Sequence, residues 1–221
     1  MGRQADKGGV FVRQDVLARR ASGLSTAFPA PHFPSELGQG VIAFDSGFAF
    51  PHLFPDLTAI ATQALTTHAG VTLQYSTPQG ELALREWIAG YMRADGCDGA
   101  AENILIVNGA KHGIDLVCRL LLDEGDSVVV TAPTYFTVIP ILKSFGASLY
   151  EVGQDEEGIS VTELGALFHR LKSEGKALPK FVYNVSDFHN PSGVTMSVQR
   201  RRALIRLCAD DDVHIVEDNP Y

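Results

Sequence analysis

Cysteines, basic clusters and long apolar runs are all scarce in this 221-residue sequence. Its three cysteines, Cys97, Cys118 and Cys208, share no metal-binding or redox spacing, and their odd number favours reduced thiols in a cytosolic protein. No apolar stretch approaches the roughly 18 residues that a membrane-spanning helix needs. The first residues also lack the apolar core of a secretory signal. We therefore expect a cytoplasmic protein that does not enter a membrane.

The charge balance is acidic, with 18 Lys and Arg against 26 Asp and Glu and a formal net charge of −8. A chain of this sign repels a phosphate backbone, so nucleic-acid binding is not expected. The run Arg200–Arg202 is the sole basic cluster, and with Asp210–Asp212 close behind it we interpret it as a solvated helix face. The 45% hydrophobic and 20% charged composition is that of a globular protein.

Apolar periodicity divides the chain into an N-terminal arm and lead-in over residues 1–41 and a domain over residues 42–221. The pattern predicts helices at 57–67 and 80–93. It then predicts short apolar strands that alternate with helices: strands at 104–107, 127–131, 147–152, 180–185 and 213–217, and helices at 114–122, 136–145, 161–175 and 198–209. Continuous apolar strands between helices predict an α/β fold, with a mostly parallel sheet covered by helices on both faces.

Ligands of such folds bind beyond the carboxyl ends of the strands, where this sequence carries polar segments. Gly109 and Ala110, at the start of a predicted helix, offer free N–H groups that suit a phosphate; a tight strand-to-helix turn explains them equally well. Asp218 ends an apolar strand. A carboxylate there is costly to bury without a cation such as a protonated pyridine nitrogen, although a helix cap or salt bridge is the alternative.

Two further strand-end residues have a functional and an ordinary interpretation. Tyr135 could stack on a planar ring, or could be a core aromatic at a helix start. Asn190, which precedes Pro191, could present its amide to a ring hydroxyl from a turn built on a cis bond, or could belong to an ordinary loop. Each residue alone is a weak signal. Their order, each at its own strand end of one predicted sheet, indicates a single pocket.

With these motifs in order, residues 42–221 resemble the large domain of fold-type I, class I/II pyridoxal-phosphate aminotransferases. The most similar subgroup contains the 2-aminoadipate and kynurenine aminotransferases and the aminotransferase-like domain of MocR regulators. The resemblance rests on residues 44–55, 73–92, 104–136 and 181–221. It implies pyridoxal phosphate as cofactor and transfer of an amino group from an amino acid to a 2-oxo acid. No metal site is expected.

The resemblance implies a role for each matching residue on the phosphate side of the cofactor. Gly109, Ala110 and Lys111 match the turn that holds the phosphate. Tyr75 matches the tyrosine that reaches the cofactor phosphate of the neighbouring subunit, which implies a homodimer.

On the ring side, Tyr135 matches the aromatic residue that stacks on the pyridine ring. Asn190 and Tyr221 match the pair that hydrogen-bonds the phenolic oxygen of the cofactor. Asp218 matches the carboxylate that keeps the pyridine nitrogen protonated, which makes the ring an electron sink. Gly47 matches the glycine near the substrate carboxylate.

Two residues depart from the family pattern: Asp187 stands where the family usually has proline, and His189 where glutamine is common. A second carboxylate at Asp187 could change the loop or the local charge. His189 could be a hydrogen-bond donor near the ring, but we favour a partly exposed loop residue.

The Schiff-base lysine of the family, and the arginine that binds the substrate carboxylate, lie beyond the position that matches Tyr221. No catalytic residue is therefore assigned in this chain. We expect a large domain that is incomplete at its C-terminus and inactive alone. The alternatives are a non-catalytic effector-binding domain of a MocR-like regulator, and a vestigial fragment.

Overall fold

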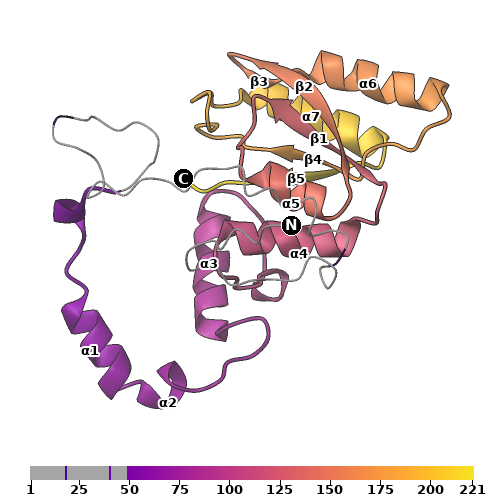
Figure 1. Cartoon of the computed structure of the whole chain (residues 1–221). Helices are drawn as coiled ribbons and strands as arrows, with labels where there is room; N and C mark the ends of the chain where they lie inside the picture. Colours follow the sequence, from indigo (N-terminus) through magenta and orange to yellow (C-terminus); the bar gives the residue numbers. More distant parts are fainter. Residues whose placement is uncertain (1–17, 19–39, 41–48) are drawn as a thin grey trace, which may run out of the picture. The chain divides into compact units, whose positions relative to one another are not determined.

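The computed structural model describes Ala18, Gly40 and residues 49–221 (Figure 1). Contacts divide the chain into two compact units, whose continuous described parts are residues 49–108 and residues 109–221. The arm predicted over residues 1–41 falls almost entirely outside the described residues, so its boundary stays a prediction.

Residues 49–108 are helical where they are regular. Their elements are η4 (Pro51–Leu53), α1 (Thr58–Thr66), α2 (Ala69–Thr72), α3 (Leu82–Ala94) and η5 (Ala101–Asn103). The helices α1 and α3 confirm the two predicted from periodicity. The buried Arg85 of α3 donates from Nη1 to the carbonyl of Ala101 at 2.8 Å and from Nε to the carbonyl of Gly80 at 3.2 Å. These bonds tie η5 and the turn before α3 to the helix.

The strand predicted over residues 104–107 is wrong: these residues are extended at Ile104 but form no ladder. The amide of Ile106 donates to the carbonyl of Gln79 at 2.9 Å, which is a single bond to a turn. A β-strand needs a neighbouring strand to satisfy its backbone groups, and in the described part of the chain none pairs with this segment. An apolar run therefore predicted the extended backbone but could not supply its partner.

Residues 109–221 form a five-stranded sheet flanked by helices. In chain order the elements are α4 (Ala110–Leu121), β1 (Ser127–Ala132), α5 (Val138–Ser144), β2 (Ser148–Asp155), β3 (Gly158–Ile159), α6 (Val161–Ser173), β4 (Phe181–Asn184), α7 (Val198–Asp210) and β5 (His214–Glu217). The strand order is β3-β2-β1-β4-β5, and every pair is parallel except β2 with β3. This confirms the predicted mostly parallel α/β sheet; the short antiparallel strand β3 was missed.

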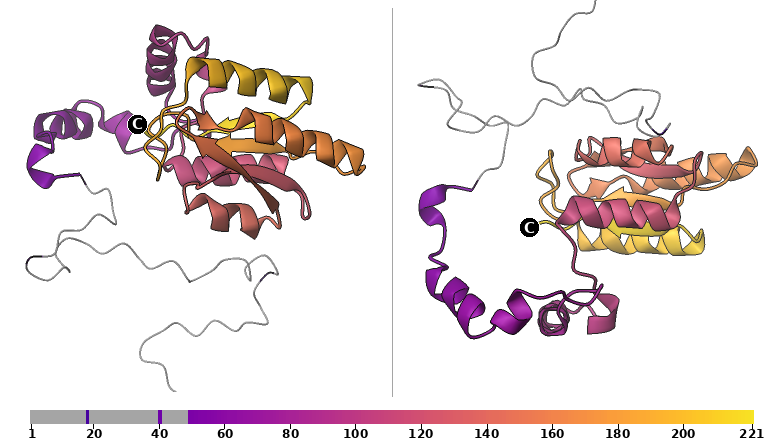
Figure 2. Two further views of the ribbon diagram at one scale, coloured as in Figure 1. Left: turned by 90° about the horizontal axis from the view of Figure 1, so that it is seen from above. Right: turned by 60° about the horizontal axis from the view of Figure 1, so that its bottom comes forward.

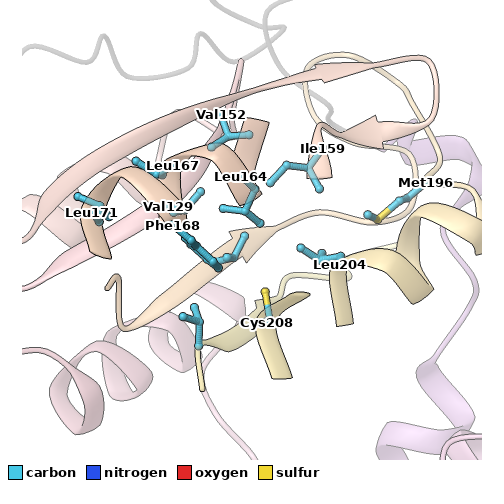
Figure 3. Close-up of a cluster of buried hydrophobic side chains, with 12 residues drawn as sticks. Val129, Val152, Ile159, Leu164, Leu167, Phe168, Leu171, Met196, Leu204 and Cys208 are labelled. Atoms are coloured by element: carbon cyan, nitrogen blue, oxygen red, sulfur yellow. The ribbon is translucent and has the colours of Figure 1, made fainter. Parts of the chain in front are cut away.

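Alternation along β1 sends neighbouring valines to opposite faces of the sheet, where two helical layers cover them (Figures 1 and 2). Val129 packs with Leu164 and Phe168 of α6 and with Cys208 of α7 in one buried cluster (Figure 3). Val128 and Val130 belong to a second cluster, which contains residues of α4 and α5. Because both faces are buried, the central strands read as continuous apolar runs in the sequence.

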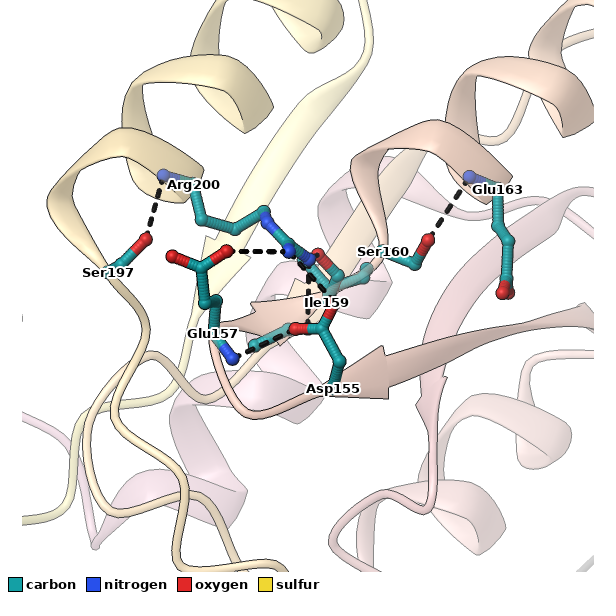
Figure 4. A network of polar contacts seen from close by, with 8 residues as sticks. Asp155, Glu157, Ile159, Ser160, Glu163, Ser197 and Arg200 are labelled. Atoms are coloured by element: carbon teal, nitrogen blue, oxygen red, sulfur yellow. Dashed lines mark hydrogen bonds and ion pairs between the residues drawn. The ribbon is translucent and has the colours of Figure 1, made fainter.

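The hairpin of β2 and β3 is held by Arg200 from α7, as Figure 4 shows. Its Nη1 donates to the carbonyl of Ile159 at 2.7 Å, and its Nη2 contacts Asp155 at 2.9 Å and Glu157 at 3.3 Å. The guanidinium holds the pKa of the Asp155 carboxyl below its usual value. The interpretation of the arginine run as a purely solvated face is therefore wrong for Arg200, whose side chain is 16% exposed.

Candidate functional site

Three polar loops meet at one edge of the sheet because β1, β4 and β5 are parallel neighbours. Tyr135 follows β1, Asn190 follows β4, and Asp218 directly follows β5. The helix α4 leads into β1 through a short turn and packs on the same buried cluster, so it runs antiparallel to β1. The first turn of α4 therefore lies at the same carboxyl edge (Figure 1).

Gly109 forms the N-cap of α4 with φ +83° and ψ 167°, a conformation that is essentially reserved for glycine. No side chain caps this helix, and a Cβ built on Gly109 would meet nothing within 4 Å. Ala110 and Lys111 occupy the exposed first turn. The helix begins four residues earlier than predicted, so the predicted turn residues carry the unpaired N–H groups and the positive end of the helix dipole.

The backbone of Asp218 is hydrogen-bonded to the neighbouring strand β4, and its side chain accepts one hydrogen bond from Tyr183. Its amide donates to the carbonyl of Asn184 at 2.9 Å, which continues the ladder of β4 and β5. Its Oδ2 accepts a hydrogen bond of 2.6 Å from the hydroxyl of Tyr183. Burial, followed by the bond to Asp218, raises the pKa of Tyr183 well above its usual value. Within the described residues this carboxylate neither caps a helix nor pairs with a cation, so neither ordinary alternative is found.

The bond between Asn190 and Pro191, in the loop after β4, is cis, as in the first of the two interpretations offered for Asn190. Asn190 is exposed, whereas His189 is only 2% exposed, so its interpretation as a partly exposed loop residue is wrong. The Nε2 atom of His189 lies 3.0 Å from Oγ1 of Thr131, and its Nδ1 lies 2.9 Å from Oγ of Ser192 and 3.3 Å from Nε2 of Gln154. The imidazole thus joins the Asn190 loop to the ends of β1 and β2.

Asp187 does not add an unpaired negative charge to this edge. Its two carboxylate oxygens accept bonds of 2.6 Å and 3.2 Å from Arg201 of α7, which also donates to the carbonyl of Ser186 at 3.2 Å. The Asp187 carboxylate raises the pKa of Arg201. Arg201, like Arg200, thus neutralises acidic groups of the strand-end loops instead of forming a solvated face.

Each of the three loops carries at least one aromatic ring. Half-buried Tyr135, in the loop after β1, has its ring centroid 5.7 Å from that of Phe136. The ring of Tyr221 lies edge-on to Phe188 at 6.1 Å between centroids, which brings the end of the β5 segment to the loop that carries Asn190.

The structure does not test the positions of the two remaining predicted residues relative to this edge. Tyr75 is 98% exposed and belongs to the unit of residues 26–108, and Gly47 lies outside the described residues. A cavity of about 660 Å³ lies between β1, β2 and α5 and is lined by none of the predicted site residues. The sequence analysis did not single out Tyr183 or Thr131, which hydrogen-bond to Asp218 and His189. The one feature that could have identified them is a hydroxyl group within an otherwise apolar strand.

Together these groups suit a planar ligand that carries a phosphate and a basic ring nitrogen. The uncapped helix N-terminus can bind an anion, the Asp218 carboxylate can accept a bond from a ring N–H, and an amide and two phenols flank them. The described residues contain no cluster of three or more metal-ligating side chains. Nor is any helix among them long and apolar enough to cross a membrane.

A family comparison and searches of characterised proteins and solved structures all identify aminotransferases among the relatives of this chain. The family described as aminotransferase class I and II matches residues 36–221. The aromatic-amino-acid aminotransferase 1 of Thermococcus litoralis is 35% identical over 184 residues, which cover 82% of this chain and 44% of that protein. An uncharacterized HTH-type transcriptional regulator of Bacillus subtilis, YdfD, is 28% identical over 188 residues, covering 85% of this chain and 38% of the regulator.

Among solved structures, the α-aminoadipate aminotransferase LysN of Thermus thermophilus, complexed with N-(5'-phosphopyridoxyl)-L-leucine, superimposes with a TM-score of 0.78 at 28% identity. The match covers 94% of this chain and 50% of that one. The chain thus spans half or less of the length of the relatives it matches.

Proposed function

Because the chain belongs to the class I and II aminotransferase family, we propose that this protein uses pyridoxal phosphate to transfer an amino group between an amino acid and a 2-oxo acid. The observation that carries the proposal is the carboxylate of Asp218 at the carboxyl edge of the sheet, the edge to which the Asn190 loop and the uncapped N-terminus of α4 also belong. When bound, pyridoxal phosphate supplies a protonated ring that accepts the negative charge that develops on the amino-acid substrate.

The first turn of α4 is proposed to hold the phosphate. The N–H groups of Gly109, Ala110 and Lys111 point out of an uncapped helix end, and the helix dipole favours a dianion there. Tyr75 is proposed to reach the phosphate in a second subunit of a homodimer. Its 98% exposure leaves the hydroxyl available to a partner.

The ring-side residues are proposed to bind and orient the heterocycle. Asp218 accepts the hydrogen bond of the ring nitrogen and keeps its proton in place, while Tyr135 stacks on the ring face. Asn190 and Tyr221 donate to the phenolic oxygen. Gly47 is proposed to lie near the substrate carboxylate. No lysine of this chain is assigned the covalent role, so the chain by itself is proposed to bind the cofactor without covalent attachment.

Binding of pyridoxal phosphate to the purified 221-residue chain tests the site directly. Equilibrium dialysis is carried out on the natural sequence and on Asp218→Asn, with Asp210→Asn on the exposed end of α7 as the matched control. We expect Asp218→Asn to weaken binding by about tenfold or more, equivalent to about 1.4 kcal/mol, because a charge-assisted bond is replaced by a neutral one. Equal affinity of Asp218→Asn and the natural sequence would refute the assignment.

A second candidate function is a non-catalytic effector-binding domain, which the similarity to the transcriptional regulator YdfD favours. Both functions share the cofactor site, so turnover separates them. Amino-acid-dependent release of a 2-oxo acid from the protein, measured with a panel of amino-acid donors, supports the enzyme. Because this chain is proposed to lack the covalent lysine, absence of turnover is expected of it under either function, so only a positive turnover result decides between them. The cytoplasmic location rests on cysteine usage and stays a prediction.

A further inference from the structure

Tyr183 is a fully buried tyrosine whose hydroxyl makes one hydrogen bond within the described residues. It lies on β4 with 0% exposure, inside the cluster that packs against α4 and α5. A phenol in such a place needs a hydrogen-bond partner, and its hydroxyl finds one in Oδ2 of Asp218 at 2.6 Å. The distance is that of a bond between a hydroxyl and an ionised carboxylate.

The geometry of this bond is fixed by the sheet and not by flexible loops. Tyr183 pairs with Val216 in the parallel ladder of β4 and β5, two residues before Asp218. The next rung is the bond from the Asp218 amide to the carbonyl of Asn184. Both the donor and the backbone of its acceptor are therefore anchored to neighbouring strands.

The bond leaves the Asp218 carboxylate with one engaged oxygen and one available oxygen. In the described part of the chain, Tyr183 is the one hydrogen-bond donor to this side chain. Because burial and the nearby carboxylate raise the pKa of Tyr183, its hydroxyl remains protonated and can only donate to Asp218. Such a donor restricts the rotation of the carboxylate, so Oδ1 is oriented before any ligand arrives.

We propose that Tyr183 is a positioning residue, which orients the Asp218 carboxylate toward the ring nitrogen of the bound cofactor. Its role depends on the proposed function of Asp218 and extends it to a residue in the core. This role predicts a change in affinity that depends on the chemistry of the ligand. Removal of the Tyr183 hydroxyl should weaken only ligands whose ring nitrogen can donate to Asp218, because the phosphate and the ring face are bound by other residues.

The experiment compares two ligands and three proteins by equilibrium dialysis. The ligands are pyridoxal phosphate and a deaza analogue in which C–H replaces the ring nitrogen. The proteins are the natural chain, Tyr183→Phe, and the control Tyr150→Phe, which removes a phenol hydroxyl from the partly buried Tyr150 on β2. We expect Tyr183→Phe to lose about tenfold in affinity for pyridoxal phosphate and to bind the analogue unchanged. Tyr150→Phe should match the natural chain with both ligands.

Each outcome separates the positioning role from a structural one. An equal loss for both ligands, or no loss for either, overturns the positioning role of Tyr183 while the site itself stands. A natural chain that binds neither ligand overturns the proposed function, and the role of Tyr183 with it. If Tyr183→Phe does not fold by circular dichroism, site-specific replacement of Tyr183 by 3-fluorotyrosine keeps the shape and changes the acidity of the donor. An unchanged ratio of the two affinities in that protein then overturns the proposal.

Discussion

The buried imidazole of His189 should make the stability of this chain depend on pH near neutrality. His189 is 2% exposed, and the three side chains that hydrogen-bond to it, those of Thr131, Gln154 and Ser192, are uncharged. Burial lowers the pKa of His189 below its ordinary value of 6.5. The perturbation is His189→Gln, because an amide is uncharged at all relevant pH values and can both donate to Thr131 and accept from Ser192.

The sign of the effect follows from the number of bound protons. Because the Gln154 amide nitrogen can only donate, we assign the neutral tautomer in which Nδ1 accepts from Gln154 and Ser192 and Nε2–H donates to Thr131. Protonation of Nδ1 would bring two N–H donors, those of His189 and Gln154, face to face and break their hydrogen bond. Protonation of His189 is therefore unfavourable in the folded chain. Just below pH 6.5 the unfolded chain therefore binds more protons than the folded one. Stability is fully present above that pH and is lost as the pH falls toward the lowered pKa of His189.

The size of this pH dependence is limited because His189 binds at most one additional proton when the chain unfolds. One histidine contributes a slope of at most about 1.4 kcal/mol per pH unit to the free energy of unfolding. Because the unfolded histidine is only half protonated at pH 6.5, the natural chain should lose up to about 1 kcal/mol between pH 6.5 and 5.5 that His189→Gln does not lose. At pH 7.5 the two proteins should agree within about 1 kcal/mol, because the amide replaces the buried hydrogen bonds.

Urea unfolding followed by circular dichroism at pH 7.5, 6.5 and 5.5 measures the difference. The matched control is His169→Gln, which changes an exposed histidine on α6 and should keep the slope of the natural chain. Titration of the carboxylates is common to all three proteins and cancels in the comparison. The reasoning fails if His189→Gln follows the same pH dependence as the natural chain, or if the natural chain gains stability as the pH falls.

Three further substitutions test the backbone, the core and the loop charge by urea unfolding. Gly109→Ala should cost about 1–3 kcal/mol although its Cβ has open space, because φ +83° with ψ 167° suits glycine alone; an unchanged stability would contradict that conformation. Leu164→Ala should cost about 2–5 kcal/mol because Leu164 is 0% exposed, whereas Leu120→Ala, at 82% exposure, should cost under about 1 kcal/mol. Asp187→Asn should cost about 1–2 kcal/mol by weakening the partly buried pair with Arg201, and a neutral result would show that solvent screens the pair.

The sheet was largely predictable because its central strands, β1 and β4, are buried on both faces and appear as continuous apolar runs. The flanking strands β2 and β5 are only partly buried, and they were recognised from their place in the alternation of strands and helices. The carboxyl ends of these strands follow from that pattern, and they predict that Tyr135, Asn190 and Asp218 lie at one edge of the sheet. The segment over residues 104–107 carried the same signal and did not form a strand, because pairing depends on a neighbour that the local sequence does not specify.

The sequence alone thus determined the class of the fold, the order of its elements and the chemical types available at the carboxyl edge. The tertiary structure decided which of those groups are paired. His189 is buried among uncharged partners, Asp187 is neutralised by Arg201, and Asp218 receives its hydrogen bond from Tyr183, which lies 35 positions away in the chain. Periodicity reports which face a residue takes, but pairing depends on strand register and on distances between elements, and these exist only once the sheet has formed.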